Sequence, residues 1–162
     1  MISKKVYQEL MNKGLTIAFS ESMSGGSLAF EMIKNEGASK VILGSLIVYS
    51  NQMKHKLLNI PLELMKTHGT VSETVVSEMA RATHQIFNSD VTVAITGNAG
   101  FSFEPKSDER SAYIAILYQD QMYVEMIHFD NLSRLKAIKK TMDFTYKKIA
   151  NLLGLQNQEK SL

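Results

Sequence analysis

The chain has 162 residues, of which 44% are hydrophobic and 21% are charged, as in ordinary globular proteins. Eighteen lysines and arginines against 16 acidic residues give a formal charge of +2, so we expect no nucleic-acid partner. The absence of cysteine excludes disulfides and thiolate metal sites. No signal peptide is visible and no apolar run is long enough to span a bilayer, so we expect a cytoplasmic protein without a membrane partner.

The N-terminal part of the sequence alternates between helix and strand patterns. Apolar residues at helical spacing predict a helix over 3–13 that ends at Gly14. The short apolar run 15–20 predicts a buried strand. Small polar residues and glycines over 21–26 then lead into a helical pattern over 28–33. A strand, a glycine turn and a helix in this order are typical of α/β proteins.

The next segment predicts a second strand and two short helices. The strand covers 41–49, where β-branched residues are frequent. One helix is expected over 51–58, and Pro61 suits the first turn of the other.

A longer helix and a central strand follow. Thr70 and Glu73 match a capping box, with Thr70 as the N-cap residue, and the helix is expected to reach about Asn88. The nearly continuous hydrophobic run 91–96 predicts a third strand that is covered on both faces.

The longest irregular segment covers 98–110, and loops of this length in compact domains are usually functional or mobile. The stretches 111–118 and 122–129 predict an antiparallel hairpin across a turn at 119–121.

The last predicted element is a helix over 133–153 that stops at Gly154. The elements together predict an α/β fold, a three-layer α/β/α sandwich with a mixed, partly parallel sheet. We expect a single domain over 1–155 and a polar tail over 156–162.

The turn 21–26 is the first candidate for a binding site, because open α/β sheets bind ligands where strands end and helices begin. A helix N-terminus favours a phosphate or carboxylate, and glycines allow the backbone to approach it. Ser22, Ser24, Gly25 and Gly26 would then contact the ligand. The alternative is that a serine only caps the helix and the glycines only turn the chain.

Ser39, Tyr49 and Lys54 form the second candidate. Ser39 precedes the strand 41–49, and the other two residues follow or end it. If they converge, a neutral Lys54 would activate a serine hydroxyl, which requires a depressed lysine pKa, and Tyr49 would assist. The sequence leaves the alternative open that Lys54 is a surface lysine and Ser39 a capping residue.

Thr96 and Gly97 form the third candidate, at the end of the central strand, as a second wall for a pocket that faces the glycine turn. The histidines lack metal-ligand spacing, and no Walker A or Rossmann glycine motif occurs. The sequence therefore predicts neither a metal nor a cofactor.

Five blocks in register resemble the CinA C-terminal domain family over nearly the whole chain. Residues 19–26 resemble its Ala-Glu-Ser-Cys-Thr-Gly-Gly motif, and 47–54 resemble its Val-x-Tyr-Ser-Asn-x-x-Lys block. Residues 57–61 are similar to its Leu-Leu-Gly-Val-Pro, and 68–72 to its His-Gly-Ala-Val-Ser. Residues 94–100 are similar to its Thr-Gly-Ile-Ala-Gly-Pro.

The resemblance implies hydrolysis of nicotinamide mononucleotide to nicotinate mononucleotide and ammonia, without a cofactor, by a homodimer that binds this small molecule. It implies Ser39 as nucleophile, Lys54 as base and Tyr49 as an assisting group. It also implies a substrate pocket formed by Ser22, Ser24, Gly25, Gly26, Asn51, Thr96, Gly97 and Arg134. In this reading Arg134 reaches the phosphate.

The chain also departs from the family. A glycine-rich turn and a Lys-Pro-Val-Gly element are absent from 101–111, and 131–134 replaces a Gly-Asp-Arg element. Met23 stands where the family has cysteine. These departures keep a second hypothesis open, in which the chain is a nucleotide-binding or partner-binding module that has lost turnover. A role in competence or DNA repair has little support from the near-neutral charge.

Overall fold

A five-stranded mixed sheet is the middle layer of the computed structural model, which describes residues 1–100 and 110–155. Its strand order is β2-β1-β3-β4-β5. The strands are β1 (Ile17–Glu21), β2 (Ile42–Ile47), β3 (Val91–Gly97), β4 (Ser111–Tyr118) and β5 (Gln121–His128). β1 pairs in parallel with β2 and β3, whereas β4 is antiparallel to both β3 and β5. The carboxyl ends of β1, β2, β3 and β5 therefore lie at the same edge of the sheet.

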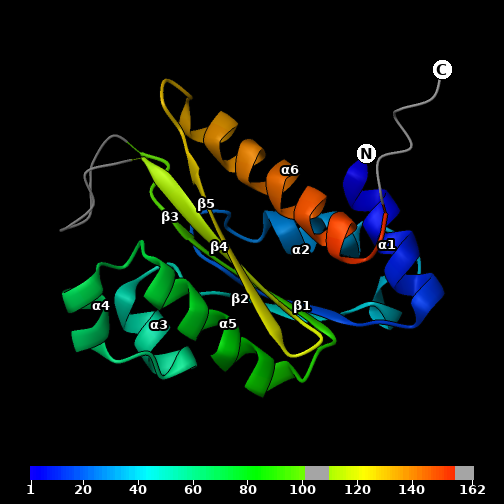
Figure 1. Cartoon of the computed structure of the whole chain (residues 1–162), viewed down its shortest axis with the longest axis horizontal. Coiled ribbons are helices and arrows are strands. Elements are labelled where there is room, and N and C mark those ends of the chain that lie inside the picture. The colour runs from blue at the N-terminus through cyan, green and yellow to red at the C-terminus, as the bar shows by residue number, and fades with distance from the viewer. Residues whose placement is uncertain (101–109, 156–162) are drawn as a thin grey trace.

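Helices cover both faces of the sheet (Figure 1). One face carries α1 (Ile2–Lys13), α2 (Ser27–Ile33) and α6 (Arg134–Leu152), and the other carries α3 (Asn51–Leu58), α4 (Leu62–His68) and α5 (Glu73–Phe87). A single 3-10 turn over Ala38–Lys40 precedes β2. This arrangement confirms the predicted α/β/α sandwich on a mixed sheet. No helix in the described ranges has the length and apolar character needed to cross a membrane.

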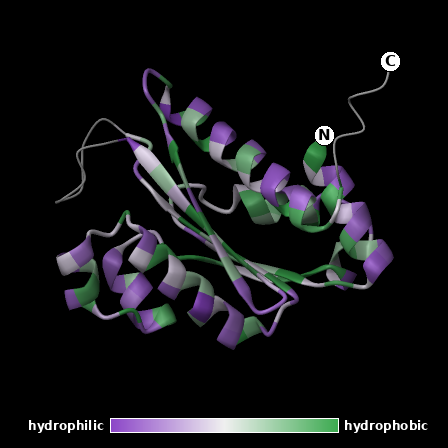
Figure 2. Cartoon of the chain, in the orientation of Figure 1, coloured by the Kyte–Doolittle hydropathy of each residue, from purple (hydrophilic) through white to green (hydrophobic). Residues whose placement is uncertain are grey.

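β3 has the central, doubly covered position that its hydrophobic run predicts. Val93 and Ile95 pack into the core on the α1, α2 and α6 side, and Ala94 between them packs on the α5 side. Figure 2 shows hydrophobic residues concentrated along the middle strands, with hydrophilic residues on the outer surfaces of the helices. Burial on both faces explains why β3 lacks the alternating pattern of a half-exposed strand.

Most element boundaries follow the predicted ones closely. α1 ends where Gly14 adopts the left-handed conformation at a φ of 64°, and α3 begins and ends as predicted. The hairpin turn is one residue shorter than expected, because Tyr118 already pairs with Gln121. Its two central residues, Gln119 and Asp120, have φ values of 52° and 60°, as the twist of a two-residue hairpin turn requires.

The predicted capping box at the start of α5 is wrong. The helix begins two residues later than Thr70 implies, and Ser72 is its N-cap residue. The Ser72 hydroxyl accepts a hydrogen bond from the amide of Val75 at 3.2 Å. Thr70 and Ser72 both precede the helix, and only the backbone conformation decides which of them caps it.

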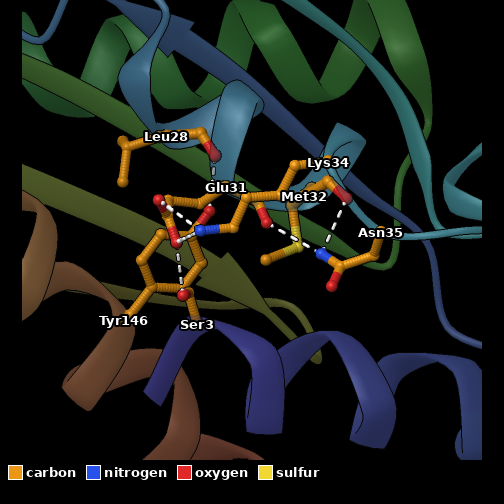
Figure 3. Close-up of polar contacts among 7 residues, drawn as sticks. All are labelled: Ser3, Leu28, Glu31, Met32, Lys34, Asn35 and Tyr146. Carbon is orange, nitrogen blue, oxygen red and sulfur yellow. Dashed lines mark hydrogen bonds and ion pairs between the residues drawn. The ribbon is translucent and has the colours of Figure 1, made fainter. Parts of the chain in front are cut away.

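A partly buried polar cluster joins α1 to α2 (Figure 3). The Glu31 carboxylate accepts hydrogen bonds from Ser3 Oγ and, at 2.8 Å, from Lys34 Nζ. Burial alone would raise the pKa of Glu31, but the hydrogen bonds from Lys34 and Ser3 lower that pKa below its ordinary value overall. Nearby, Tyr146 donates from its hydroxyl to the Leu28 carbonyl (Figure 3). Burial, with the negative charges of Glu21 and Glu31, raises the pKa of Tyr146 well above its ordinary value, so this donor stays protonated.

The lowered pKa of Glu31 predicts a pH-dependent contribution to stability. A carboxyl whose pKa is depressed in the folded state stabilises the fold above its unfolded pKa, and this stabilisation is lost as the pH falls through the folded pKa. We expect Glu31→Gln to lower the free energy of unfolding by about 2 kcal/mol at neutral pH. In urea titrations the gap between the two proteins should shrink as the pH falls towards 3, and a gap independent of pH would contradict this assignment.

Candidate functional site

A hydroxyl and an amine from different segments meet at the carboxyl edge of the parallel strands. Ser22 directly follows β1, and Lys54 lies in the first turns of α3, which follows β2. Lys54 Nζ is 3.2 Å from Ser22 Oγ. This distance is within the reach expected of a nucleophile and its base.

Lys54 is a buried lysine, with 1% of its surface exposed. Ser50 caps α3 by accepting a hydrogen bond from the amide of Met53, which fixes the start of the helix beside the end of β2. From there the lysine amine donates to the Val48 carbonyl at 2.9 Å and contacts Ser22. The Lys54 amine is therefore held inside the protein by these partners instead of extending into solvent.

The turn that carries Ser22 is tight, and two of its residues have positive φ. Gly25 and Gly26 have φ values of 60° and 92°, which favour glycine. The Gly25 amide donates to the Ser22 carbonyl at 3.1 Å. The amides of Met23 and Ser24 make no hydrogen bond within the described part of the chain. Two backbone donors next to Ser22 therefore have no acceptor within the described ranges.

Gly97 allows this turn to pack against the end of β3. A Cβ atom at Gly97 would lie 2.3 Å from the sulfur of Met23 and 2.8 Å from the Cβ of Ala112. The turn after β1 and the end of β3 are thus in direct contact at Gly97, where the sequence predicted the wall of a pocket. The role of Gly97 seen in the structure is to make room for Met23.

The carboxylate of Glu21 occupies the N-terminus of α2. Glu21 is fully buried and accepts hydrogen bonds from the amides of Gly26, Leu28 and Ala29 at 3.0, 3.1 and 2.9 Å. Ser45 Oγ also donates to this carboxylate, at 3.2 Å. The expectation that a ligand phosphate binds these helix amides is therefore wrong, because the chain supplies its own anion there.

Ser39 lies far from Lys54. It is exposed in the 3-10 turn before β2, whereas Lys54 follows the carboxyl end of that strand. At about 3.3 Å per residue, β2 alone separates the two regions by roughly 16 Å. The expectation that Ser39 lies beside Lys54 is wrong, because an extended strand keeps the residues at its two ends apart.

Tyr49 and Arg134 meet at the same edge as the Ser22–Lys54 pair. Arg134, the first residue of α6, donates from Nη2 to the Tyr49 hydroxyl at 2.7 Å. Both side chains are exposed. The predicted assisting tyrosine and the predicted phosphate-binding arginine therefore form a polar rim that joins the end of β2 to the start of α6.

Asn51, Thr70 and Thr96 form a hydrogen-bond chain across this edge. Thr96 Oγ1 donates to the Thr70 carbonyl at 2.9 Å, and Thr70 Oγ1 donates to Asn51 Oδ1 at 2.9 Å. The Thr96 hydroxyl was predicted to face a ligand, but it donates its hydrogen bond to the Thr70 carbonyl instead. Thr70 was not predicted as a site residue, because its position before α5 favoured a capping role.

Arg110 was also not predicted. Its guanidinium donates to two carbonyls after β3 and to two after β5, those of Ala99, Gly100, Phe129 and Asp130. It thus links the end of β3 to the connection between β5 and α6. The altered segment 101–109 lies outside the described residues. In the ranges that the structure describes, no three histidine or acidic side chains come together as a metal site would require.

The fold and this edge define a class, an α/β/α protein with a buried serine–lysine pair where parallel strands end. The model of the CinA C-terminal domain family matches residues 1–153, and the chain belongs to this family.

Curated relatives agree with this assignment. A CinA-like protein of Prochlorococcus marinus is 43% identical over 99 residues, which are 61% of this chain and 23% of that protein. A putative competence-damage inducible protein of Shouchella clausii is 31% identical, over 84% of this chain and 34% of its own length. The MG115 homolog of Mycoplasma pneumoniae is 33% identical, over 76% of this chain and 78% of its own. The chain thus spans about a quarter to a third of the first two relatives and most of the third.

Solved structures show the same fold. A competence-damaged protein (CinA) superfamily protein from Klebsiella pneumoniae aligns with a TM-score of 0.89 at 20% identity, over 96% of this chain and 97% of its own. A competence or damage-inducible protein from Enterobacter asburiae aligns with a TM-score of 0.88 at 24% identity, over 94% and 96% of the two chains. At these identities the likeness concerns the architecture.

Proposed function

We propose that the chain is an amidohydrolase in which Ser22 is the nucleophile and Lys54 its base. The observation that carries the proposal is the 3.2 Å separation of Lys54 Nζ and Ser22 Oγ in a buried setting. Serine is a weak nucleophile until a neighbouring base removes its proton. This proposal keeps Lys54 as the base and moves the nucleophile from Ser39 to Ser22.

Lys54 takes up and releases a proton in each half of the reaction. The neutral amine takes the Ser22 proton as Oγ attacks the amide carbonyl carbon, and the resulting ammonium gives that proton to the departing nitrogen. Ammonia departs and an ester remains on Ser22. Lys54 then takes a proton from the water that attacks this ester, and it returns that proton to Ser22 Oγ as the bond between Oγ and the acyl carbon breaks. The first step requires a neutral amine, and the hydrogen bond to the Val48 carbonyl holds that amine beside Ser22.

The backbone amides of Met23 and Ser24 are suited to stabilise the tetrahedral intermediate. An oxyanion forms on the former carbonyl oxygen while Ser22 attacks, and preorganised N–H donors lower the energy of that charge. In other hydrolases that place a serine in a strand–turn–helix element, the amide after the nucleophile has this role. Met23 occupies the equivalent position here.

Nicotinamide mononucleotide is the proposed substrate, with nicotinate mononucleotide and ammonia as products. Membership of the CinA C-terminal domain family supports this choice. The Arg134 guanidinium and the Tyr49 hydroxyl at the rim suit the substrate phosphate, since guanidinium groups pair well with phosphate oxygens. The two groups already share a hydrogen bond, so phosphate would enter an existing polar cluster.

Incubation of the purified protein with nicotinamide mononucleotide tests the proposal. We expect ammonia and nicotinate mononucleotide to form in equal amounts, and Lys54→Ala to form neither. A thermal-shift measurement with the same compound separates this function from the alternative. A higher melting temperature without any product would instead identify a binding module, because a ligand that binds the folded state stabilises it.

A further inference from the structure

Thr70 is held on both its backbone and its side chain. It lies in the connection between α4 and α5, where its carbonyl accepts a hydrogen bond from Thr96 Oγ1. Its own hydroxyl donates to Asn51 Oδ1 at 2.9 Å. Thr70 is 8% exposed, so solvent competes little for these bonds. The end of β3 thus fixes Thr70, and Thr70 contacts the first residue of α3.

This contact determines which end of the Asn51 amide remains available. An asparagine side chain has one carbonyl acceptor and one NH2 group with two donors. Thr70 donates to the Asn51 oxygen and so fixes which way the amide faces, and Asn51 Nδ2 makes no hydrogen bond within the part of the chain that the structure describes. Two donor hydrogens are therefore left for an external acceptor.

Asn51 is also close to the proposed catalytic pair along its helix. Residues three apart in a helix are neighbours on its surface, and Lys54 is three residues after Asn51 in α3. Lys54 in turn contacts Ser22. Asn51 is therefore a neighbour of Lys54 on α3, at the edge of the sheet where Lys54 meets Ser22.

We propose that Thr70 is a positioning residue, which orients the Asn51 amide so that Nδ2 donates to an acceptor oxygen of the bound substrate. This inference rests on the proposed amidohydrolase function. The position of Thr70 just before α5 suggests only a helix-capping role, whereas this inference assigns the residue a role in substrate binding. Without the Thr70 hydroxyl, the Asn51 amide can rotate and present its carbonyl, which would repel a substrate oxygen.

Thr70→Val removes the hydroxyl and keeps the shape of the side chain. We expect kcat/KM for nicotinamide mononucleotide to fall roughly five- to tenfold, the effect of one neutral hydrogen bond. Thr70→Ser, which restores the hydroxyl, should restore the rate. In an Asn51→Ala background, Thr70→Val should have no further effect on kcat/KM, because the group that it orients is absent.

A merely structural role for Thr70 predicts other results. The melting temperature would fall, and kcat/KM would fall by the same factor with Asn51 present or replaced. Such equal factors would overturn the inference, as would an unchanged kcat/KM in folded Thr70→Val.

A nuclear magnetic resonance measurement tests the orientation without activity. The side-chain amide signals of Asn51 should shift in Thr70→Val and return to their wild-type positions in Thr70→Ser. Unchanged signals in the folded valine variant would overturn the positioning role. If the wild-type protein does not hydrolyse nicotinamide mononucleotide although these signals respond as expected, the proposed function fails while the contact that orients Asn51 stands.

Discussion

Ser22→Ala is expected to lower kcat for nicotinamide mononucleotide hydrolysis by roughly a thousandfold or more, and Lys54→Ala by a similar factor. Without the Ser22 hydroxyl no covalent intermediate forms, and without the Lys54 amine the hydroxyl keeps its proton. The double variant should be hardly slower than either single variant, because the two groups act as one unit. Steady-state ammonia release by the three variants measures these effects.

Ser39→Ala is the matched control for this series. Ser39 is an exposed serine at the amino end of β2, so its replacement should leave kcat within about twofold of wild type. If Ser39→Ala lowered kcat as much as Ser22→Ala, Ser39 would be the better candidate for the nucleophile. Independent, multiplicative losses in Ser22→Ala and Lys54→Ala would show that the two residues do not act together.

The second large effect is expected at Glu21. Its carboxylate is fully buried and accepts bonds from three amides and from Ser45 Oγ. Glu21→Gln replaces one acceptor oxygen by a donor NH2 group that faces other donors. We expect the free energy of unfolding to fall by about 3 kcal/mol, the scale for charge-assisted hydrogen bonds that are lost in a buried site. Urea denaturation at neutral pH measures this loss.

Glu21→Gln should also affect catalysis, because Ser22, the proposed nucleophile, is the next residue in the chain. Disruption of the cap frees the start of α2 and the turn that carries Ser22, so kcat should fall together with stability. Glu63→Gln is the control, since the Glu63 side chain is 82% exposed and its ion pair with Lys66 is long, at 3.9 Å. Equal destabilisation by Glu21→Gln and Glu63→Gln would contradict the capping role.

Much of the fold could be predicted from local signals. Gly14 marks the end of α1, Asn51 and Leu58 bound α3, and the continuous hydrophobic run of β3 indicates its central position. Such signals can be read from the sequence because the residue that ends a helix, or that is buried on both faces of a sheet, is itself the residue whose type is restricted. The start of α5 was missed, since Thr70 and Ser72 are chemically almost equivalent as caps.

The candidate site was predicted in part. Ser22, Tyr49, Lys54 and Arg134 all lie at the expected edge, because the carboxyl ends of parallel strands meet there. The same rule argues against Ser39, which precedes its strand, and it could have indicated Ser22 as the partner of Lys54. The cap by Glu21 and the bond between Thr70 and Asn51 depend on how side chains reach across elements, which sequence spacing does not specify.

The most direct test of a Ser22 nucleophile is the mass of the protein during turnover. Wild-type protein quenched within the first turnover of nicotinamide mononucleotide should carry an added mass equal to the substrate less ammonia. Peptide analysis should place this adduct on Ser22, and Ser39→Ala should form it equally well. An adduct on another residue, or full turnover by Ser22→Ala, would contradict the account.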